Sequence, residues 1–193
     1  MRQFVYFSST ARTSGNFPVD NLMSAGRMDI VMHVIINAFF LSHSLRDDVK
    51  LHLVFYGMPD PPKHIEMQVK PETELSKKDV AGLIRKILYK YKEGRKTEVL
   101  PGCFVEKKSF LRVIEELKKQ GNELFVLDKK GENIREAKLS DKCIFVIGDQ
   151  NGLPKKELKR LKEIGRIVSI GPKTYFASHT VTILNNEMDL RGF

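Results

Sequence analysis

Three short, uninterrupted apolar runs in the last third of the chain constrain its fold more than any other feature. The runs are Leu124–Leu127, Cys143–Ile147 and Ile167–Ile170. Strands buried on both faces of a parallel sheet have this character, whereas strands that face water on one side alternate. A helix over Pro154–Ile164, with proline in its first turn, separates the second run from the third. The pattern predicts an α/β fold with a mostly parallel sheet flanked by helices.

The earlier part of the chain supplies further elements of both kinds. Four more strands are predicted, at Gln3–Phe7, Val49–Tyr56, His64–Val69 and Cys103–Val105. Four more helices are predicted, at Met28–Leu45, from a capping Ser76 to about Tyr91, at Ser109–Gln120 and at Ser178–Leu190. A chain of 193 residues is long enough for one good core, so we expect a single domain.

The positive charge of the chain is unevenly spread. The formal net charge is +9, and residues 76–120 alone carry 13 basic and 6 acidic side chains. A localised basic surface favours a polyanionic partner, with nucleic acid first and an anionic membrane surface second. A solvated, lysine-rich helix face is the alternative.

Several classes of protein are disfavoured by what the sequence lacks. Cys103 and Cys143 match neither a disulfide framework nor a zinc spacing, so we expect buried free thiols and no metal. The apolar run at the N-terminus is too short, and its neighbours are too polar, for a signal peptide. The apolar stretch Ile30–Leu41 is too short to cross a bilayer. We therefore expect a cytoplasmic protein with no membrane partner.

Two glycine-bearing loops follow adjacent predicted strands. Gly148 follows the run Cys143–Ile147, and Gly171 follows the run Ile167–Ile170. Ligands of open parallel sheets bind beyond the carboxyl ends of the strands, and glycine allows the backbone to approach a ligand closely. The loops predict a small-molecule site, although two plain turns are the alternative. The fingerprints of dinucleotide and P-loop sites are missing, which disfavours an oxidoreductase.

These loops resemble the cofactor region of a known superfamily. Ile147–Pro154 and Ser169–Pro172 are similar to the part of the SPOUT methyltransferases that binds S-adenosylmethionine in a C-terminal trefoil knot. Phe17–Leu22, Ser24–Asp29 and Ala38–His43 resemble the archaeal tRNA pseudouridine N1-methyltransferases of that superfamily. With the segment Tyr175–Asp189, the resemblance covers essentially the whole chain.

The resemblance implies a fold, an activity and an assembly. The fold would be one SPOUT domain over residues 1–193, with an RNA-facing part at about 1–120 and a knotted, cofactor-binding part at about 121–193. The activity would be S-adenosylmethionine-dependent methylation of N1 of pseudouridine at position 54, in the T-loop of tRNA. The enzyme would be a homodimer, and helices Met28–Leu45 and Ser178–Leu190 are candidates for the contact.

The resemblance also implies which residues hold the cofactor. They are Leu127, Gly148, Ile170, Gly171, Pro172, Tyr175, Phe176, Thr180 and Val181. Two positions depart from the family pattern: Thr180 stands where cysteine is common, and Asn185 stands where histidine is common. No essential role is carried over to either position.

Arg27 and Asp29 are the candidate catalytic residues. N1 of pseudouridine carries a proton and is a poor nucleophile until that proton leaves, and a positioned carboxylate can accept it. A guanidinium can stabilise the anion that spreads onto the flanking carbonyl oxygens. The alternatives are a first-turn acid favoured by the helix dipole and a surface ion pair.

Contacts to the RNA are expected from basic and aromatic side chains. The candidate phosphate contacts are Arg46, Lys77, Lys78, Arg85 and Lys86. Tyr175 and Phe176 would flank the adenine or stack on a flipped base, with core packing as the alternative. His33 and Asn37 are expected to form a polar pair in the core or at a dimer contact. Two other functions compete with this one. The first is the same methylation on ribosomal RNA, which a related family with an Arg-x-Asp pattern performs. The second is a non-catalytic RNA-binding module.

Overall fold

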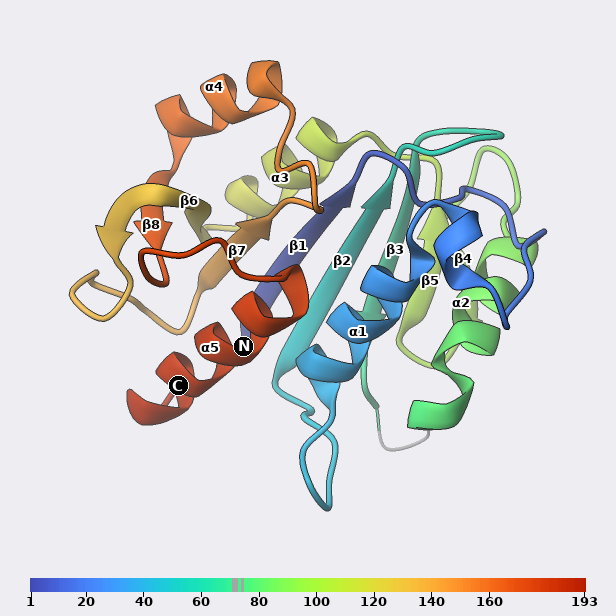
Figure 1. Ribbon diagram of the computed structural model, residues 1–193, viewed down its shortest axis with the longest axis horizontal. Helices are drawn as coiled ribbons and strands as arrows, with labels where there is room; N and C mark the ends of the chain where they lie inside the picture. The colour runs from blue at the N-terminus through green and yellow to red at the C-terminus, as the bar shows by residue number, and fades with distance from the viewer. Residues whose placement is uncertain (71–72, 74) are drawn as a thin grey trace.

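The computed structural model describes residues 1–70, 73 and 75–193. In this part of the chain, one sheet has the strand order β4-β5-β3-β2-β1-β7-β6-β8 (Figure 1). The strands are β1 (Arg2–Ser8), β2 (Val49–Phe55), β3 (Lys63–Gln68), β4 (Thr97–Leu100), β5 (Cys103–Glu106), β6 (Glu123–Asn133), β7 (Cys143–Ile147) and β8 (Arg166–Ser169). The helices are α1 (Met28–Phe39), α2 (Val80–Tyr89), α3 (Phe110–Lys119), α4 (Lys155–Ile164), α5 (Ala177–Leu190) and the short 3-10 helices η1 (Leu22–Ala25) and η2 (Lys77–Asp79).

The sheet has a parallel part and an antiparallel part. β2, β1, β7, β6 and β8 are parallel to one another, and β3, β5 and β4 extend the β2 edge with antiparallel pairings. The predicted α/β fold with a largely parallel sheet and flanking helices is therefore confirmed. The trefoil knot stays a prediction.

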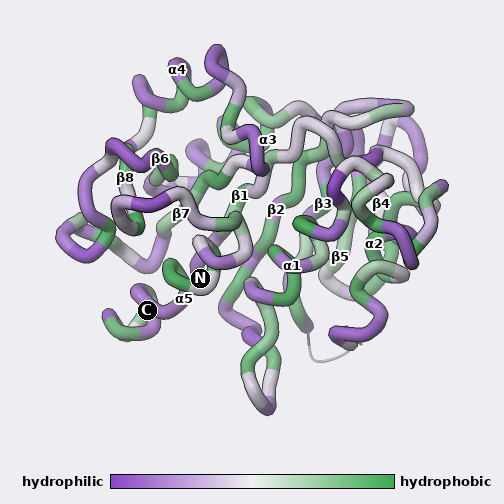
Figure 2. Tube along the Cα trace, viewed as in Figure 1, coloured by the Kyte–Doolittle hydropathy of each residue, from purple (hydrophilic) through white to green (hydrophobic). Residues whose placement is uncertain are grey.

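Each face of the sheet has its own hydrophobic core. On β1, Phe4 and Tyr6 belong to a core shared with α1, α2 and α5, whereas Val5 and Phe7 pack with α3 and α4. All seven residues of β1 are buried, as expected for a central strand covered on both sides. Figure 2 shows the central strands, β2 above all, as the hydrophobic middle of the molecule.

Two predicted boundaries are wrong for local reasons. The helix expected over Met28–Leu45 ends at Phe39, because the chain reverses in a turn closed by the N–H of Leu41 donating to the carbonyl of Ser44. The strand predicted at Leu124–Leu127 continues to Asn133 and pairs with Val168 of β8 twice, at Leu127 and again at Glu132. Asp128, which was expected just after this strand, therefore lies inside β6.

Smaller differences concern the middle of the chain. Ser76 was predicted to cap a helix, but its side chain makes no capping hydrogen bond, and η2 precedes α2. Strand β4 was not predicted, because its four residues lack both alternation and a continuous apolar run. The two cysteines are buried and free, as expected, and burial raises the pKa of Cys103 to about 11. None of the helices in the described part of the chain has the length and hydrophobicity needed to cross a bilayer.

Candidate active site

A pocket of about 260 Å³ lies beyond the carboxyl ends of β7 and β8, as the loop sequences predict, and beside the irregular middle of β6 at Leu127–Lys129. Six of the predicted cofactor residues line it: Leu127, Gly148, Ile170, Gly171, Tyr175 and Thr180. The lining also includes residues that the sequence did not single out, among them Asp128, Lys129, Gly152, Leu153, Lys173 and Thr174.

Three predicted cofactor residues lie outside this lining. Val181 is fully buried in the core, one residue along α5 from Thr180. Pro172 is exposed on the loop after β8. Phe176 is 67% exposed and lines a neighbouring hollow instead. Helical geometry accounts for Val181, because successive residues of a helix face different directions.

The glycines of the two loops permit tight backbone packing. A Cβ atom on Gly148 would lie 2.5 Å from the carbonyl carbon of Gly152, so only glycine fits there. Gly171 has φ +151°, which is unfavourable for L side chains, and a Cβ atom on it would lie 3.0 Å from the hydroxyl of Tyr175. The turns thus bring backbone close to the pocket from two adjacent strands.

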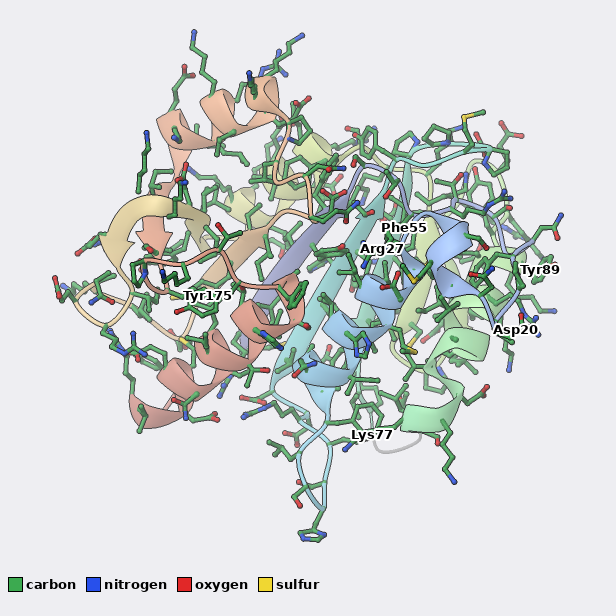
Figure 3. The ribbon with its side chains drawn as sticks, viewed as in Figure 1. Asp20, Arg27, Phe55, Lys77, Tyr89 and Tyr175 are labelled. Atoms are coloured by element: carbon green, nitrogen blue, oxygen red, sulfur yellow. The ribbon has the colours of Figure 1, made fainter. Side chains whose placement is uncertain are left out.

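A second hollow, of about 270 Å³, adjoins the first and reaches α1. The two share Gly152, Thr174, Tyr175 and Ala177 in their linings. The far wall of the second hollow is Ile30, the residue after Asp29. Figure 3 labels Arg27 at the start of α1 and Tyr175 before α5, both in front of the sheet. Arg27 and Asp29 themselves line neither hollow, but Ile30 follows Asp29 directly, and Asp29, Arg27 and Asp149 are all near enough to act electrostatically on the hydroxyl of Tyr6. The glycine loops and the start of α1 therefore lie on the same side of a single chain.

Arg27 and Asp29 form a two-pronged ion pair at the start of α1. Nε of Arg27 donates to Oδ1 of Asp29 at 3.0 Å, and Nη2 donates to Oδ2 at 3.0 Å. The hydrogen bonds from Arg27 lower the pKa of Asp29, so the carboxylate stays ionised. Nη1 of Arg27 has no hydrogen-bond partner in the described part of the chain, and the side chain is 37% exposed.

The backbone at Arg27 is in an unusual conformation. Its φ and ψ are 62° and 42°, the left-handed region, and within the described residues no other non-glycine has a positive φ. Such a conformation costs on the order of 1–2 kcal/mol for a residue with a Cβ atom. The preceding Gly26 is also left-handed, and a Cβ atom there would lie 1.8 Å from the carbonyl oxygen of Thr10. The turn is therefore pressed against the chain that leaves β1.

The segment Ser9–Ala11, directly after β1, connects the two sides of the site. Both the N–H and the hydroxyl of Ser9 donate to Oδ2 of Asp149 at 2.7 Å, in the loop after β7. The hydroxyl of Thr10 donates to the carbonyl of Gly26 at 2.9 Å. Sequence reasoning did not propose Asp149 as a site residue, although its position after Gly148 was the available signal. Asp149 also contributes, after burial, to a raised pKa of Tyr6 beneath the site.

The residues predicted to contact RNA phosphates lie away from the two hollows. Arg46 precedes β2 and is held by Asp189, with Nη1 donating to Oδ1 at 2.9 Å. The ammonium of Lys77 lies 5.4 Å from the ring centre of Phe40, beyond the end of α1 opposite to Arg27 (Figure 3). On η2 and α2, Lys78 and Lys86 are exposed and Arg85 is half-buried.

The polar residues in the middle of α1 and α5 have structural contacts. Nδ2 of Asn37 donates to the carbonyl of His33, and the hydroxyl of Thr182 donates to Oδ1 of Asn37 at 2.7 Å. Asn185 is buried and donates to the carbonyl of Asn37 at 3.1 Å. Thr180 donates to the carbonyl of Phe176 one turn earlier. Asn185 thus fastens α5 to α1, and Thr180 lines the pocket.

The overall architecture defines the class of protein. The fold is similar to that of Archaeoglobus fulgidus Nep1 bound to S-adenosylhomocysteine, with a TM-score of 0.63 and 16% identity over 100% of this chain and 99% of that one. It is also similar to the SpoU methyltransferase AviRb of Streptomyces viridochromogenes, with a TM-score of 0.51 and 14% identity over 100% of this chain and 61% of that one. The chain has the fold of the SPOUT methyltransferases.

Sequence comparison places the chain in a particular family. The family model described as "Putative SAM-dependent RNA methyltransferase" matches residues 1–193, and the chain belongs to this family. Two similar relatives carry the name tRNA (pseudouridine(54)-N(1))-methyltransferase. The one from Methanococcoides burtonii is 35% identical over 98% of this chain and 96% of its own length. The one from Pyrococcus abyssi is 34% identical over 100% of this chain and 99% of its own.

Proposed function

We propose that this chain methylates N1 of pseudouridine 54 in tRNA, with S-adenosylmethionine as the methyl donor. The observation that carries the proposal is the hollow that joins the glycine-lined pocket to Ile30, beside Asp29. A methyl donor in the first pocket and an acceptor base in the adjoining hollow would then lie next to each other. The names of the full-length relatives support the choice of acceptor atom and position. A tRNA substrate would place the enzyme in the cytoplasm.

The residues of the first pocket fit such a cofactor. Leu127 and Ile170 offer apolar walls, the glycine turns at Gly148 and Gly171 bring backbone close, and Asp128 offers a carboxylate suited to ribose hydroxyls. The cofactor would supply a methyl group on a cationic sulfur, which a nucleophile accepts by in-line displacement. The chain itself must align that nucleophile, and alignment can supply much of the rate.

Asp29 and Arg27 would act on the acceptor base. The pKa of Asp29 is lowered, so the carboxylate is a weak base but a permanent hydrogen-bond acceptor for N1–H. The free Nη1 of Arg27 would donate to a carbonyl oxygen of the base, which stabilises negative charge as the N1 proton is drawn away. Asp29 would therefore hold the N1 proton by a hydrogen bond while the N1–methyl bond forms and the methyl–sulfur bond breaks. The proton would then leave along this hydrogen bond to the partly exposed carboxylate and on to solvent.

Exposed apolar groups around the site support a homodimer. Tyr175 and Phe176 are 38% and 67% exposed, which suits stacking on a flipped base or on a partner subunit. Met32 and Ile36 of α1 and Ile183 of α5 are half-buried and pack at the edge of the core. Large apolar side chains in such positions commonly mark a protein contact. A clean monomer with full activity in solution would contradict the dimer.

The decisive experiment is mass spectrometry of nucleosides after reaction with a tRNA that carries pseudouridine at position 54. We expect N1-methylpseudouridine at that position from the wild-type chain. Asp29→Asn keeps the shape but removes the charge, and we expect turnover to fall about 100-fold at saturating cofactor. The matched control is Asp47→Asn, an exposed acid beyond the far end of α1. Turnover of Asp29→Asn close to that of the control would remove Asp29 from the mechanism.

A further inference from the structure

Helix α4 is strongly basic and buries little apolar surface. Its ten residues, all of them described, include five basic and two acidic side chains, and Leu161 alone is fully buried. The rest of residues 121–193 is charge-balanced, so the entire positive excess of the C-terminal third lies on this helix. Helices in proteins are stabilised mainly by packing of an apolar face, and α4 has little of it.

Three of the five basic side chains of α4 lie on the side of the helix nearest the cofactor pocket, and Lys156 and Arg160 lie on an adjacent side. Leu153, just before the helix, lines the pocket, and so does Asp128, which pairs with Lys162 at 3.1 Å. Lys155 and Lys159 stand seven and three residues before Lys162, which puts all three on one side of the helix. That side is therefore the one that faces the rim at Asp128.

Four of these side chains have no acidic partner. Lys155, Lys156, Lys159 and Arg160 are exposed, and within the described residues no carboxylate lies within 4.0 Å of any of them. Lys155 and Lys156 also occupy the first turn of a helix that no side chain caps. These two cations oppose the helix dipole, and Glu157 in the same turn offsets only part of their charge.

We propose that Lys155, Lys156, Lys159 and Arg160, here called the α4 basic surface, bind phosphate groups of the RNA whose target base enters the neighbouring hollow. The proposal rests on the proposed function and extends it to a substrate-binding surface. Lys155 and Lys159 are one turn, about 6 Å, apart along the helix axis. The α4 basic surface begins two residues after Leu153, which lines the pocket. The predicted contacts on η2 and α2 lie near β5, at the other end of the sheet order.

The chemistry of α4 favours RNA over an anionic membrane. A helix that binds a bilayer surface presents a broad apolar face beside its cations. The apolar side chains Leu158 and Leu161 of α4 instead pack against the core on the α3 side of the sheet. What α4 shows to solvent is charge without an apolar row, which suits phosphates of a polynucleotide.

The test compares two triple variants that remove the same charge. Lys155→Gln, Lys156→Gln and Lys159→Gln together remove the α4 lysines. The control is Lys119→Gln, Lys138→Gln and Lys142→Gln, three exposed lysines near the amino ends of β6 and β7. Binding of a tRNA with pseudouridine at position 54 is titrated between about 50 and about 300 mM salt, and S-adenosylmethionine affinity is measured by calorimetry.

The α4 variant should bind tRNA at least about tenfold more weakly at about 100 mM salt. The slope of log affinity against log salt should be shallower by about 2, from about 0.7–0.9 for each lost contact. Its cofactor affinity and the tRNA affinity of the control should match wild type. The proposal is overturned if the two variants bind tRNA equally well. It is also overturned if the α4 variant loses binding to anionic vesicles but keeps its binding to tRNA. If the wild-type chain binds tRNA but forms no methylated nucleoside, the proposed function fails while this comparison still decides the surface.

Discussion

Arginine–aspartate pairs stand at both ends of the parallel strands, and they are built differently. At the amino end, Arg2 pairs with Asp48 at 2.7 Å and with Asp189 at 2.8 Å, and its side chain is 2% exposed. At the carboxyl end, Arg27 pairs with Asp29 at 3.0 Å, and its side chain is 37% exposed. Arg2 sits in a regular strand, whereas Arg27 sits in a left-handed turn.

The remaining donors of the two arginines show what each pair does. Arg2 also donates to the carbonyl of Asn185 at 2.9 Å and to that of Phe193 at 2.6 Å, so it joins β1 to the end of α5. Nη1 of Arg27 has no hydrogen-bond partner in the described part of the chain, and the side chain is partly exposed. Nε of Arg2 is also without a partner among the described residues, but it is buried. The two arginines therefore differ in access: only the partly exposed Arg27 can offer its free donor to a ligand, whereas Arg2 holds the fold.

The largest effect should come from Arg2→Met. The change removes a buried cation and leaves the Asn185 and Phe193 carbonyls without their donors, while Asp48 and Asp189 stay hydrated because they are 39% and 40% exposed. We expect a loss of about 3 kcal/mol in the free energy of unfolding, measured by urea denaturation. Arg12→Met, which changes an exposed arginine near the carboxyl end, should cost less than about 0.5 kcal/mol. Equal losses would remove the contrast between the two ends.

Between the two ends, a buried histidine pair should make stability depend on pH. Nδ1 of His52 lies 3.0 Å from Nε2 of His64, whose Nδ1 lies 3.0 Å from Glu106. Burial lowers the pKa of both histidines in the folded state. The unfolded chain therefore binds protons first as the pH falls, so the stability held above about pH 6.5 is lost below it.

The loss should amount to about 2 kcal/mol between about pH 7 and about pH 5, measured by denaturant unfolding at each pH. The contribution of Glu106 to stability can be separated from that of the histidines. Its pKa is lowered to about 2, so this contribution is lost only below about pH 4.5. His52→Gln should remove the contribution of His52 and leave that of His64, so the loss of stability between about pH 7 and about pH 5 becomes smaller. A wild-type curve that is already flat there would show that the pair is protonated in the folded state.

Asp149→Asn should weaken the connection between the cofactor loops and the start of α1. The carboxylate accepts two hydrogen bonds from Ser9, and hydrogen bonds to a charged group are about twice as strong as neutral ones. Asp149 is a positioning residue, so we expect kcat to fall about tenfold with KM for tRNA nearly unchanged. Asp141→Asn, an exposed acid before β7, is the matched control. A rise in KM alone would instead place Asp149 in direct contact with the RNA.

Uninterrupted apolar runs in the sequence made the parallel half of the sheet predictable. The run Cys143–Ile147 is β7 to the residue, and the glycine loops after β7 and β8 do line one pocket. Both outcomes follow from burial and from the meeting of parallel strand ends at one edge. The bend that carries β6 past Asp128 was not predictable, because it depends on Gly131 packing against Val168, far along the chain.

Contacts between distant segments account for the rest of what the sequence could not show. No local pattern distinguishes Arg2, which is buried and paired with Asp189, from the exposed Arg12. Arg46 was predicted to contact phosphate from its charge alone; the fold pairs it with Asp189, and its contact with RNA stays a prediction. Asp149 becomes a candidate only when Ser9 is found beside it. The role of each of these charged side chains depends on a partner that only the fold brings next to it.

The smallest expected effect concerns the backbone of Arg27 and separates its strain from its chemistry. Arg27→Gly and Arg27→Ala both remove the guanidinium, so methylation should fall equally in the two variants. Only glycine takes φ 62° without a steric penalty. Arg27→Gly should therefore be more stable than Arg27→Ala by about 1 kcal/mol in urea unfolding, after allowance for the greater freedom of glycine in the unfolded chain. Equal stabilities would mean that the turn is relaxed and that the ion pair alone fixes Arg27. If Arg27→Gly is more stable but inactive, the backbone strain at Arg27 is the cost of placing its guanidinium at the site. Arg2 carries no such strain, because its backbone is that of a regular strand.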